Sequence, residues 1–348
     1  MDTYNKTEFL PPTLLSTPFA HAAAGPVGMR SAKTVIDGAV DLCDSLLTCD
    51  LGRPPSVTVR HNGTVRWPAD TLTARWQAEW RGRHPGERSD PKVAVHRLRT
   101  GARGQAEIEL AQTDWGQVQG AQAGFLALHG DSRGRTSFLS ALLSGSRAPV
   151  PNIATVHGVI ETADNMILVN RRSHLVKYYP LTWSCSFEEG MEPGDVAEVG
   201  SNAFHRAARR GITEEFGLKA DRDGLTVLGL LGDTAAMSVA AVVHCRIPVP
   251  AERLCTGPKA AQAPDAWEHT RYTLLPACPE TLAGLLLGAA RPPGDTSPER
   301  SGTGRSHESL SWHPTSRYRL LLTMLFRFGR ARTAAALAQA ALLQQRAP

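Results

Sequence analysis

Two hydrophobic periodicities occur along the chain, and together they predict a protein of mixed helices and strands. Apolar residues recur at helical spacing in four segments, residues 33–47, 70–80, 201–216 and 318–345. Alternating or short continuous apolar runs are typical of strands and occur at 56–60, 65–67, 93–98, 106–111, 153–160, 166–169, 225–231 and 237–247. Asn62-Gly63 lies between the first two runs and is typical of a two-residue hairpin turn.

Proline-rich and polar stretches divide this pattern into segments. Residues 1–30 contain four prolines and no clear periodicity, so we interpret them as a flexible tail. The segment 148–152 contains two prolines and marks a boundary. We therefore predict a small α+β domain over residues 31–150 and a second domain over residues 151–348. Within the second domain, residues 291–309 are rich in Pro, Gly, Ser and charge, which predicts a disordered insertion.

Composition and charge narrow the class of protein. A hydrophobic fraction of 42% and a charged fraction of 20% are ordinary for a globular chain of 348 residues. The net charge of +5 suits anionic small molecules such as nucleotides, and nucleic acid is not indicated because no dense Lys/Arg run occurs. The six cysteines lack zinc-site spacing and are expected to be free thiols. Without a secretory leader or an apolar stretch long enough to span a bilayer, we expect a cytoplasmic protein, whose oligomeric state the sequence does not indicate.

The chemistry is concentrated between Trp183 and Leu218. A glycine-punctuated acidic stretch contains Glu188, Glu189, Glu192 and Asp195. A helix over residues 201–216 follows, with Ser201 or Asn202 as its cap and a glycine just after its end. Positions 211, 214 and 215 share one face of this helix, because they lie three and four residues apart. Two adjacent glutamates beside an acidic loop are oxygen ligands of the kind that Mg²⁺ or Mn²⁺ binds.

These residues resemble the Nudix box, G-x5-E-x7-R-E-U-x-E-E-x-G-U, in which U is a bulky aliphatic residue. The segment Arg210–Leu218, RGITEEFGL, resembles the second half of the box. Residues 192–195 resemble the loop that opens it, and residues 159–172 resemble the two strands that precede it. The resemblance covers residues 153–275. It implies an α/β fold, a Nudix α/β/α sandwich with a mixed sheet, which the small α+β domain precedes.

The resemblance also implies a reaction: Mg²⁺-dependent (or Mn²⁺-dependent) hydrolysis of the pyrophosphate bond in a nucleoside diphosphate linked to another moiety. The residues that it implies for catalysis are Glu214, Glu215 and Arg210. The metal ligands that it implies are Glu214, Glu215, Asp195 and Glu192. Candidates for binding the nucleotide-like substrate are Arg171, Arg172 and Trp183, with core packing as the alternative for the tryptophan. Glu268 is a further candidate base or ligand.

The sequence departs from the Nudix pattern in three places. Fourteen residues rather than seven separate Asp195 from Arg210, and Glu189 stands where the box has its first glycine. Gly211 stands where the family has a glutamate that is usually a metal ligand on the helix. A glycine inside a helix costs about 0.5–1 kcal/mol relative to alanine. The residues alone give no reason for it, so Gly211→Glu would be expected to stabilise the helix and to strengthen metal binding.

The missing carboxylate keeps two other functions open. The first is a catalytically weak or inactive Nudix-fold module that binds a nucleotide as a sensor. The second is a structural protein in which the resemblance is fortuitous, and a structure without a sheet beside the helix at 201–216 would support it. The sequence does not name the substrate, because specificity in a shared fold resides in loops and neighbouring domains.

Overall fold

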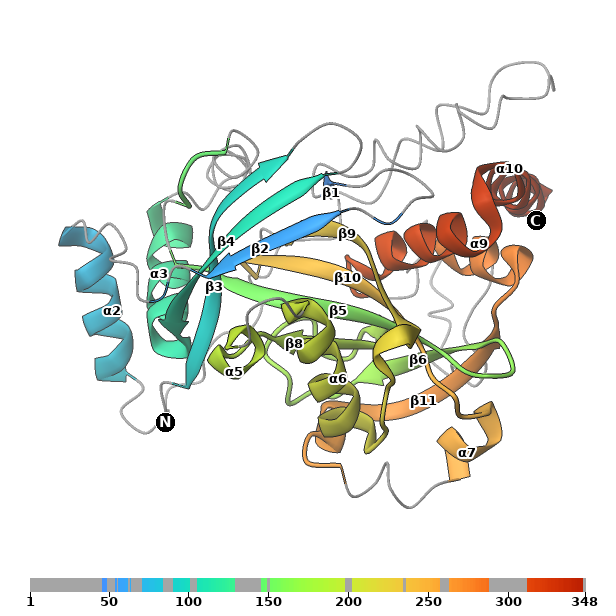
Figure 1. Cartoon of the computed structure of the whole chain (residues 1–348), viewed down its shortest axis with the longest axis horizontal. Coiled ribbons are helices and arrows are strands. Elements are labelled where there is room, and N and C mark those ends of the chain that lie inside the picture. The colour runs from blue at the N-terminus through green and yellow to red at the C-terminus, as the bar shows by residue number, and fades with distance from the viewer. Residues whose placement is uncertain are drawn as a thin grey trace, which may run out of the picture.

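The computed structural model describes most of the chain from residue 46 onwards. The described residues are 46–48, 54, 56–61, 63, 71–83, 90–100, 105–128, 145–148, 151–197, 202–233, 236–256, 263–287 and 312–346. The predicted tail at 1–30 and the predicted insertion at 291–309 lie outside them. Figure 1 shows a larger sheet with helices on both sides and a smaller sheet beside it.

The larger sheet is mixed. In the described part of the chain it has eight strands, six of them in the order β1-β9-β10-β5-β6-β11, while β7 pairs with β6 and β8 with β5. Their bounds are β1 Leu46–Thr48, β5 Ile153–Glu161, β6 Met166–Arg172, β7 Trp183–Ser184, β8 Phe187–Gly190, β9 Leu225–Asp233, β10 Ser238–Arg246 and β11 His269–Pro276. The strands β10 and β5 run parallel, and the other described pairs are antiparallel. The predicted α/β class with a mixed sheet is confirmed.

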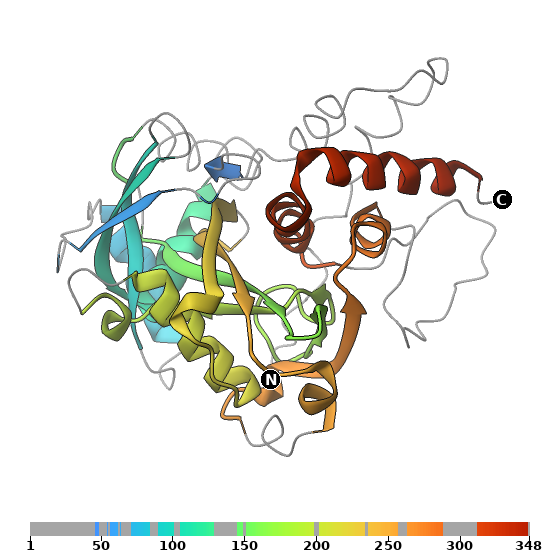
Figure 2. The ribbon, with the colours of Figure 1, turned by 45° about the vertical axis from the view of Figure 1, so that its right-hand side comes forward.

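Helices cover both faces of this sheet. The helix α6, Ala203–Phe216, packs on one face, and α9, Pro279–Leu287, and α10, Ser316–Arg346, pack on the other (Figures 1 and 2). Side chains that alternate along a strand separate the two cores, so Val156 belongs to the α6 side and Val159 to the α9–α10 side. The remaining short elements are α5 Pro193–Val196, η3 Arg222–Gly224, α7 Ala251–Thr256 and η4 Ala266–Glu268.

The central helix follows its local signals closely. Asn202 caps α6, and its side chain accepts a hydrogen bond from the backbone N–H of Phe204 at 3.1 Å. Gly217 ends the helix in the left-handed conformation with φ 64°, which glycine adopts without strain. The apolar stripe of Phe204, Ala208 and Ile212 is buried, as the helical spacing predicted. The same left-handed freedom lets α10 bend at Gly329, with φ 75°.

The smaller sheet has the strand order β2-β4-β3. Its elements are β2 Val57–His61, α2 Thr71–Arg83, β3 Pro91–Thr100, β4 Ala106–Asp114 and α3 Trp115–Leu128. The strands β2 and β4 are parallel, and β3 and β4 are antiparallel. The helices α2 and α3 pack against each other. Three strands and one helix of this unit were expected near these positions, whereas α3 was not predicted.

Two local predictions in this unit need correction. The helix expected over 33–47 is wrong at its end, because Leu46–Thr48 form strand β1, which pairs with β9 in antiparallel fashion. The rest of that prediction, residues 33–45, lies outside the described residues. The hairpin expected at Asn62-Gly63 is not tested, since residues 64–70 lie outside them as well. The described partner of β2 is instead the parallel strand β4.

The two units contact each other through β3 and the start of β5. The side-chain amide of Asn152 donates to the carbonyl of Val95 at 2.8 Å and accepts from its N–H at 3.1 Å. Buried apolar residues of both units, such as Leu98 and Met191, belong to one continuous cluster. The division of the chain into two domains near residue 150 stays a prediction. Two domains with this boundary would share the apolar cluster that contains Leu98 and Met191.

Gly211 has a packing role that the sequence did not reveal. A Cβ atom on Gly211 would lie 3.0 Å from the Cβ of Glu189 and 3.1 Å from two ring carbons of Phe187. On the other side of the same ring, a Cβ on Gly158 would lie only 1.9 Å from a ring carbon of Phe187. The two glycines thus let α6 approach β8 and β5 with one phenylalanine between them. The new Cβ of Gly211→Glu would meet the same atoms, so we expect the cost of this contact to offset the predicted gain in helix stability.

We predict that Gly211→Ala lowers the free energy of unfolding. Overpacking of a core costs about 1–3 kcal/mol and should exceed the propensity gain of about 1 kcal/mol. The control is Gly82→Ala in α2, where nothing lies within 4 Å of the new Cβ and alanine should stabilise by about 0.5–1 kcal/mol. Urea denaturation measures both variants. Equal stabilisation by the two alanines would contradict the packing role of Gly211.

Candidate functional site

The strand β8 presents two glutamates in succession, and they interact with opposite sides of the sheet. Side chains alternate along a strand, so neighbours point to opposite faces. Glu189 forms an ion pair with Arg210 of α6, whereas Glu188 forms one with Arg319 of α10. The acidic stretch expected as a loop is therefore partly a strand. It pairs with β5 and supplies a carboxylate to each of two separate polar networks.

The first network converges on the guanidinium of Arg210. Its Nη1 donates to Glu189 at 2.9 Å and to Glu214 at 3.0 Å. Its Nη2 donates to Asp195 at 2.9 Å and to the carbonyl of Gly190 at 2.7 Å. One side chain thus joins β8, α5 and α6, and it brings together two of the predicted metal ligands, Glu214 and Asp195. These carboxylates also hold the pKa of Arg210 above its ordinary value, although burial opposes the charge.

A third predicted ligand, Glu192, lies at the edge of this network. Its Oε1 is 3.7 Å from Nη1 of Arg210 and 2.9 Å from Nζ of Lys92, which belongs to β3 of the smaller sheet. Its backbone N–H donates to the carboxylate of Asp195 at 2.8 Å, which fixes the turn that opens α5. The residues Glu192 and Asp195 therefore approach the C-terminal half of α6, as the box resemblance predicted.

Glu189 is a carboxyl group that the sequence did not assign to the site. It lies deep in the network, and burial raises its pKa to about 7, with the nearby charge of Glu214 acting in the same direction and Arg210 opposing it. Because its pKa lies near neutrality, this carboxyl group can exchange a proton under ordinary conditions. The alternation of side chains along residues 187–190 could have indicated this role. Glu189 lies two residues after Phe187, so its side chain points to the same face of the sheet as that aromatic ring.

Glu215, predicted as a main metal ligand, does not contact Arg210 among the described residues. Its Oε2 lies 2.5 Å from Nε2 of His269, and its Oε1 has no hydrogen-bond partner among the described residues. Burial raises the pKa of Glu215 well above its usual range, helped by the charges of Glu268 and Glu189. Burial likewise lowers the pKa of His269 to about 4, so a protonated carboxyl facing a neutral imidazole is the favoured pair. Phe216 stacks on this imidazole at 5.5 Å.

The carboxylates around Arg210 are of the chemical type that a hard divalent cation binds, although their oxygens do not surround a common point. The side chains that meet at Arg210 offer carboxylate oxygens, which Mg²⁺ and Mn²⁺ prefer. Oε1 of Glu215 is buried without a hydrogen-bond partner, and the charge of Glu189 reaches this carboxyl group. Within the described ranges, however, no three or more His, Cys, Asp or Glu side chains form a group that could hold a metal ion. Binding would therefore require these carboxylates to turn away from Arg210 or from His269.

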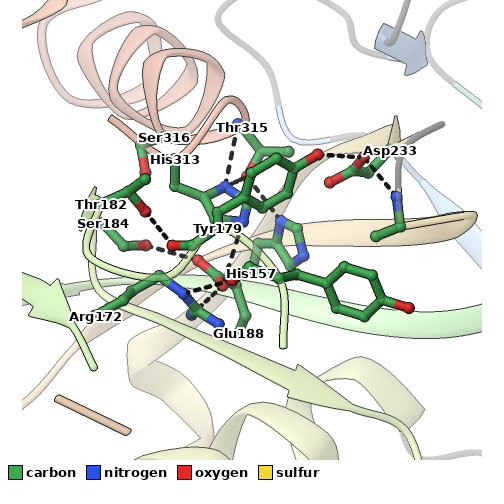
Figure 3. A network of polar contacts seen from close by, with 12 residues as sticks. His157, Arg172, Tyr179, Thr182, Ser184, Glu188, Asp233, His313, Thr315 and Ser316 are labelled. Carbon is green, nitrogen blue, oxygen red and sulfur yellow. Dashed lines mark hydrogen bonds and ion pairs between the residues drawn. The ribbon is translucent and has the colours of Figure 1, made fainter. Parts of the chain in front are cut away.

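The second network surrounds Glu188 and ties the C-terminal helix to the sheet (Figure 3). The side chain of Arg319 is 0% exposed, and it donates to Glu188 at 2.6 Å and to the carbonyl of Cys185 at 2.9 Å. Arg172 pairs with the other oxygen of Glu188, and Ser184 donates to the first at 2.6 Å. Burial opposes ionisation here, but the charges of Arg172 and Arg319 hold the pKa of Glu188 well below its usual range.

Residues just before α10 complete this second network. The hydroxyl of Thr315 accepts from Arg319 at 2.6 Å and lies 2.9 Å from Nδ1 of His313. Tyr179 meets His313 edge-on at 4.5 Å and donates to Asp233 at 3.0 Å (Figure 3). The contacts of Tyr179 join segments more than 50 residues apart in sequence, so local patterns could not have predicted them.

The predicted substrate residues lie in different surroundings. Arg172 is buried and engaged by Glu188, and Arg171 lies opposite Arg271 in the β6–β11 ladder. Trp183 is buried in the apolar cluster on the α9–α10 side, which corresponds to the core-packing alternative. In contrast, Trp267 on η4 is 50% exposed, and η4 is joined to α6 by a hydrogen bond from the N–H of Asp265 to the carbonyl of Glu214 at 2.9 Å.

Glu268, the further candidate base, adjoins this exposed tryptophan. Burial raises its pKa to about 7, while the charge of Arg172 acts in the opposite direction. Its carbonyl accepts from the N–H of Ser173 at 2.7 Å, which fixes η4 to the end of β6. The charge of Glu268 also contributes to the raised pKa of Glu215, so the two carboxyl groups lie close enough to interact.

Comparisons with known proteins found matches among solved structures only. No protein-family model matches the chain, and no curated protein matches it. Among solved structures, a MutT/Nudix family protein from Listeria innocua matches with 18% identity over 40% of this chain and 83% of its own, at a TM-score of 0.27. The MutT protein of Methanosarcina mazei matches with 17% identity over 39% and 81%, also at a TM-score of 0.27.

A third structure is the Nudix domain of NrtR from Shewanella oneidensis, solved with ADP ribose. It matches with 14% identity over 36% of this chain and 73% of its own, at a TM-score of 0.25. None of the described helices is long and apolar enough to cross a membrane.

We predict that Arg319→Met destabilises the protein by about 3–5 kcal/mol, because it removes one cation from a buried carboxylate. The control is Arg75→Met in α2, which breaks the exposed ion pair with Glu79 and should change stability by about 0–0.5 kcal/mol. Chemical denaturation at neutral pH compares the two. A loss at Arg319 no larger than that at Arg75 would show that the buried network does not hold α10 in place.

Proposed function

We propose that this protein hydrolyses the pyrophosphate bond of a nucleoside diphosphate linked to another moiety, with the help of Mg²⁺ or Mn²⁺. The observation that carries the proposal is the convergence of Glu189, Asp195 and Glu214 on Arg210. The box resemblance expects an arginine to orient carboxylates of the loop and of the helix. Here the arginine contacts both elements, and the seven-residue extension between them does not prevent it.

Each residue would have a distinct part in the reaction. Glu189, Glu192, Asp195 and Glu214 would hold the cation, and Arg210 would orient the carboxylates. When bound, such a cation supplies charge for the phosphate oxygens and lowers the pKa of a coordinated water. Glu268 has a pKa of about 7 and can accept a proton from an attacking water at neutral pH. Glu215 would join these ligands once the proton that it holds against Nε2 of His269 is lost to solvent.

A second function, the nucleotide-binding or sensor module, is favoured by specific features of the same site. Gly211 provides no carboxylate, and Glu215 faces His269 rather than the Arg210 network. No ready-made group of three ligands is found in the described residues. In a sensor, the nucleotide would bind without being cleaved, and binding would persist in the presence of a chelator.

The prediction that separates these functions uses Glu215→Gln. In a screen of nucleoside diphosphate derivatives with Mg²⁺ or Mn²⁺, we expect the wild type to hydrolyse at least one compound. The variant should lose about 100-fold or more in kcat, because a neutral amide is a poor ligand for a hard cation. Phosphate released after phosphatase treatment is the readout. Glu280→Gln, at an exposed position in α9, is the control and should retain full activity.

Two results would count against this assignment. A wild type that turns over together with an equally active Glu215→Gln variant would remove α6 from the catalytic site. A wild type that binds a nucleotide in chelator but hydrolyses none of the compounds would favour the sensor.

A further inference from the structure

The smaller N-terminal sheet places a lysine in the acidic site of the larger unit. Lys92 lies on β3, and its Nζ is 2.9 Å from Oε1 of Glu192. The neighbouring backbone anchors this contact, because the N–H of Val93 donates to the carbonyl of Met191 at 3.0 Å. The lysine stem also lies near Gly190 at the end of β8, and the charge of Lys92 lowers the pKa of Glu189. The lysine therefore acts on the site through two of its carboxylates.

The charges around Arg210 do not balance. The carboxylates of Glu189, Glu192, Asp195 and Glu214 face the cations of Arg210 and Lys92. If all four acids are ionised, two negative charges are left over, which is the deficit that a divalent cation would neutralise. The deficit alone does not define a site, but Oε1 of Glu215 is buried without a hydrogen-bond partner, and this carboxyl group lies close enough to Glu189 for their charges to interact.

The two protein cations differ in how firmly they are held. Arg210 makes five hydrogen bonds, which reach β8, α5 and its own helix α6, and its partner Asp195 is buried. The side chain of Lys92 is 17% exposed, whereas that of its partner Glu192 is 42% exposed. Partly exposed ion pairs contribute little to stability, so this pair can open at small cost. Glu192 is thus the carboxylate that an incoming cation can recruit most easily.

We propose that Lys92 is a positioning residue that acts as an internal counter-ion of the metal site. It holds Glu192 while the site lacks a metal and releases this carboxylate when a divalent cation binds. The N-terminal unit thereby sets the metal affinity of the larger unit. This inference rests on the metal site of the proposed function, but it concerns binding rather than hydrolysis.

The test is titration of the full-length protein with MnCl₂ by isothermal calorimetry. Lys92→Met frees Glu192 and removes a competing positive charge, so the dissociation constant for Mn²⁺ should fall about 3–10-fold. Lys92→Arg keeps the charge and should bind as the wild type does. Arg60→Met is the matched control. Arg60 lies on β2, at the edge of the small sheet opposite to β3, and forms an ion pair with Glu107 at 2.6 Å.

A double-mutant cycle isolates the contact itself. In a Glu192→Gln background, which should bind Mn²⁺ more weakly, Lys92→Met should lose most of its effect. Thermal unfolding in chelator reports whether each variant is folded, and Lys92→Gln provides a second neutral replacement if the methionine variant is not.

The outcomes separate this inference from the proposed function. Unchanged or weaker Mn²⁺ binding in the neutral Lys92 variants overturns the inference, and so does a wild type that binds no Mn²⁺. Tighter Mn²⁺ binding without hydrolysis of any nucleotide supports the inference and rejects the proposed function. Hydrolysis that depends on Mn²⁺, with the same affinity in all Lys92 variants, supports the function and rejects the inference.

Discussion

The guanidinium of Arg210 is the interaction on which the candidate site depends. Carboxylates from β8, α5 and α6 approach one another closely, and they would repel without a cation between them. The arginine supplies that cation and also fixes their direction, because its donors are held in a rigid planar fork. The site can therefore exist in a folded, metal-free protein. The same contacts occupy carboxylate oxygens that a metal would need, so metal binding has to compete with the protein's own charges.

The position of the carboxylates depends in turn on β8, which is fixed from both sides. On one side Phe187 fills the space that Gly158 and Gly211 leave free. On the other side Glu188 is held by the fully buried Arg319 at the start of α10. Gly211, which lacks the carboxylate that the Nudix box has at this position, is thus part of the packing that brings α6 close to β8. The C-terminal helix contributes to the site without touching it, by holding the strand that carries Glu189.

Local sequence patterns predicted the parts of this arrangement that local physics determines. The end of α6 at Gly217, its cap and its buried stripe follow from propensity and periodicity, as do the strands β5, β6, β9 and β10. Contacts between distant segments were beyond such patterns. The pairing of Glu215 with His269 spans 54 residues, and that of Glu188 with Arg319 spans 131. The residues of β1 were expected to end a helix, because the apolar residues before and within them recur at helical spacing. That spacing carries no information about the edge of β9, with which they pair.

The proposed function requires that the carboxylates gathered by Arg210 bind a divalent cation. A crystal structure of the protein with MnCl₂, with anomalous scattering recorded at the manganese edge, tests it directly. We expect an anomalous peak at about 2.1 Å from oxygens of Glu189 and Glu214, with Glu192 turned away from Lys92. An unchanged Arg210 network at saturating MnCl₂, with no anomalous peak beside it, would rule out a cation site here.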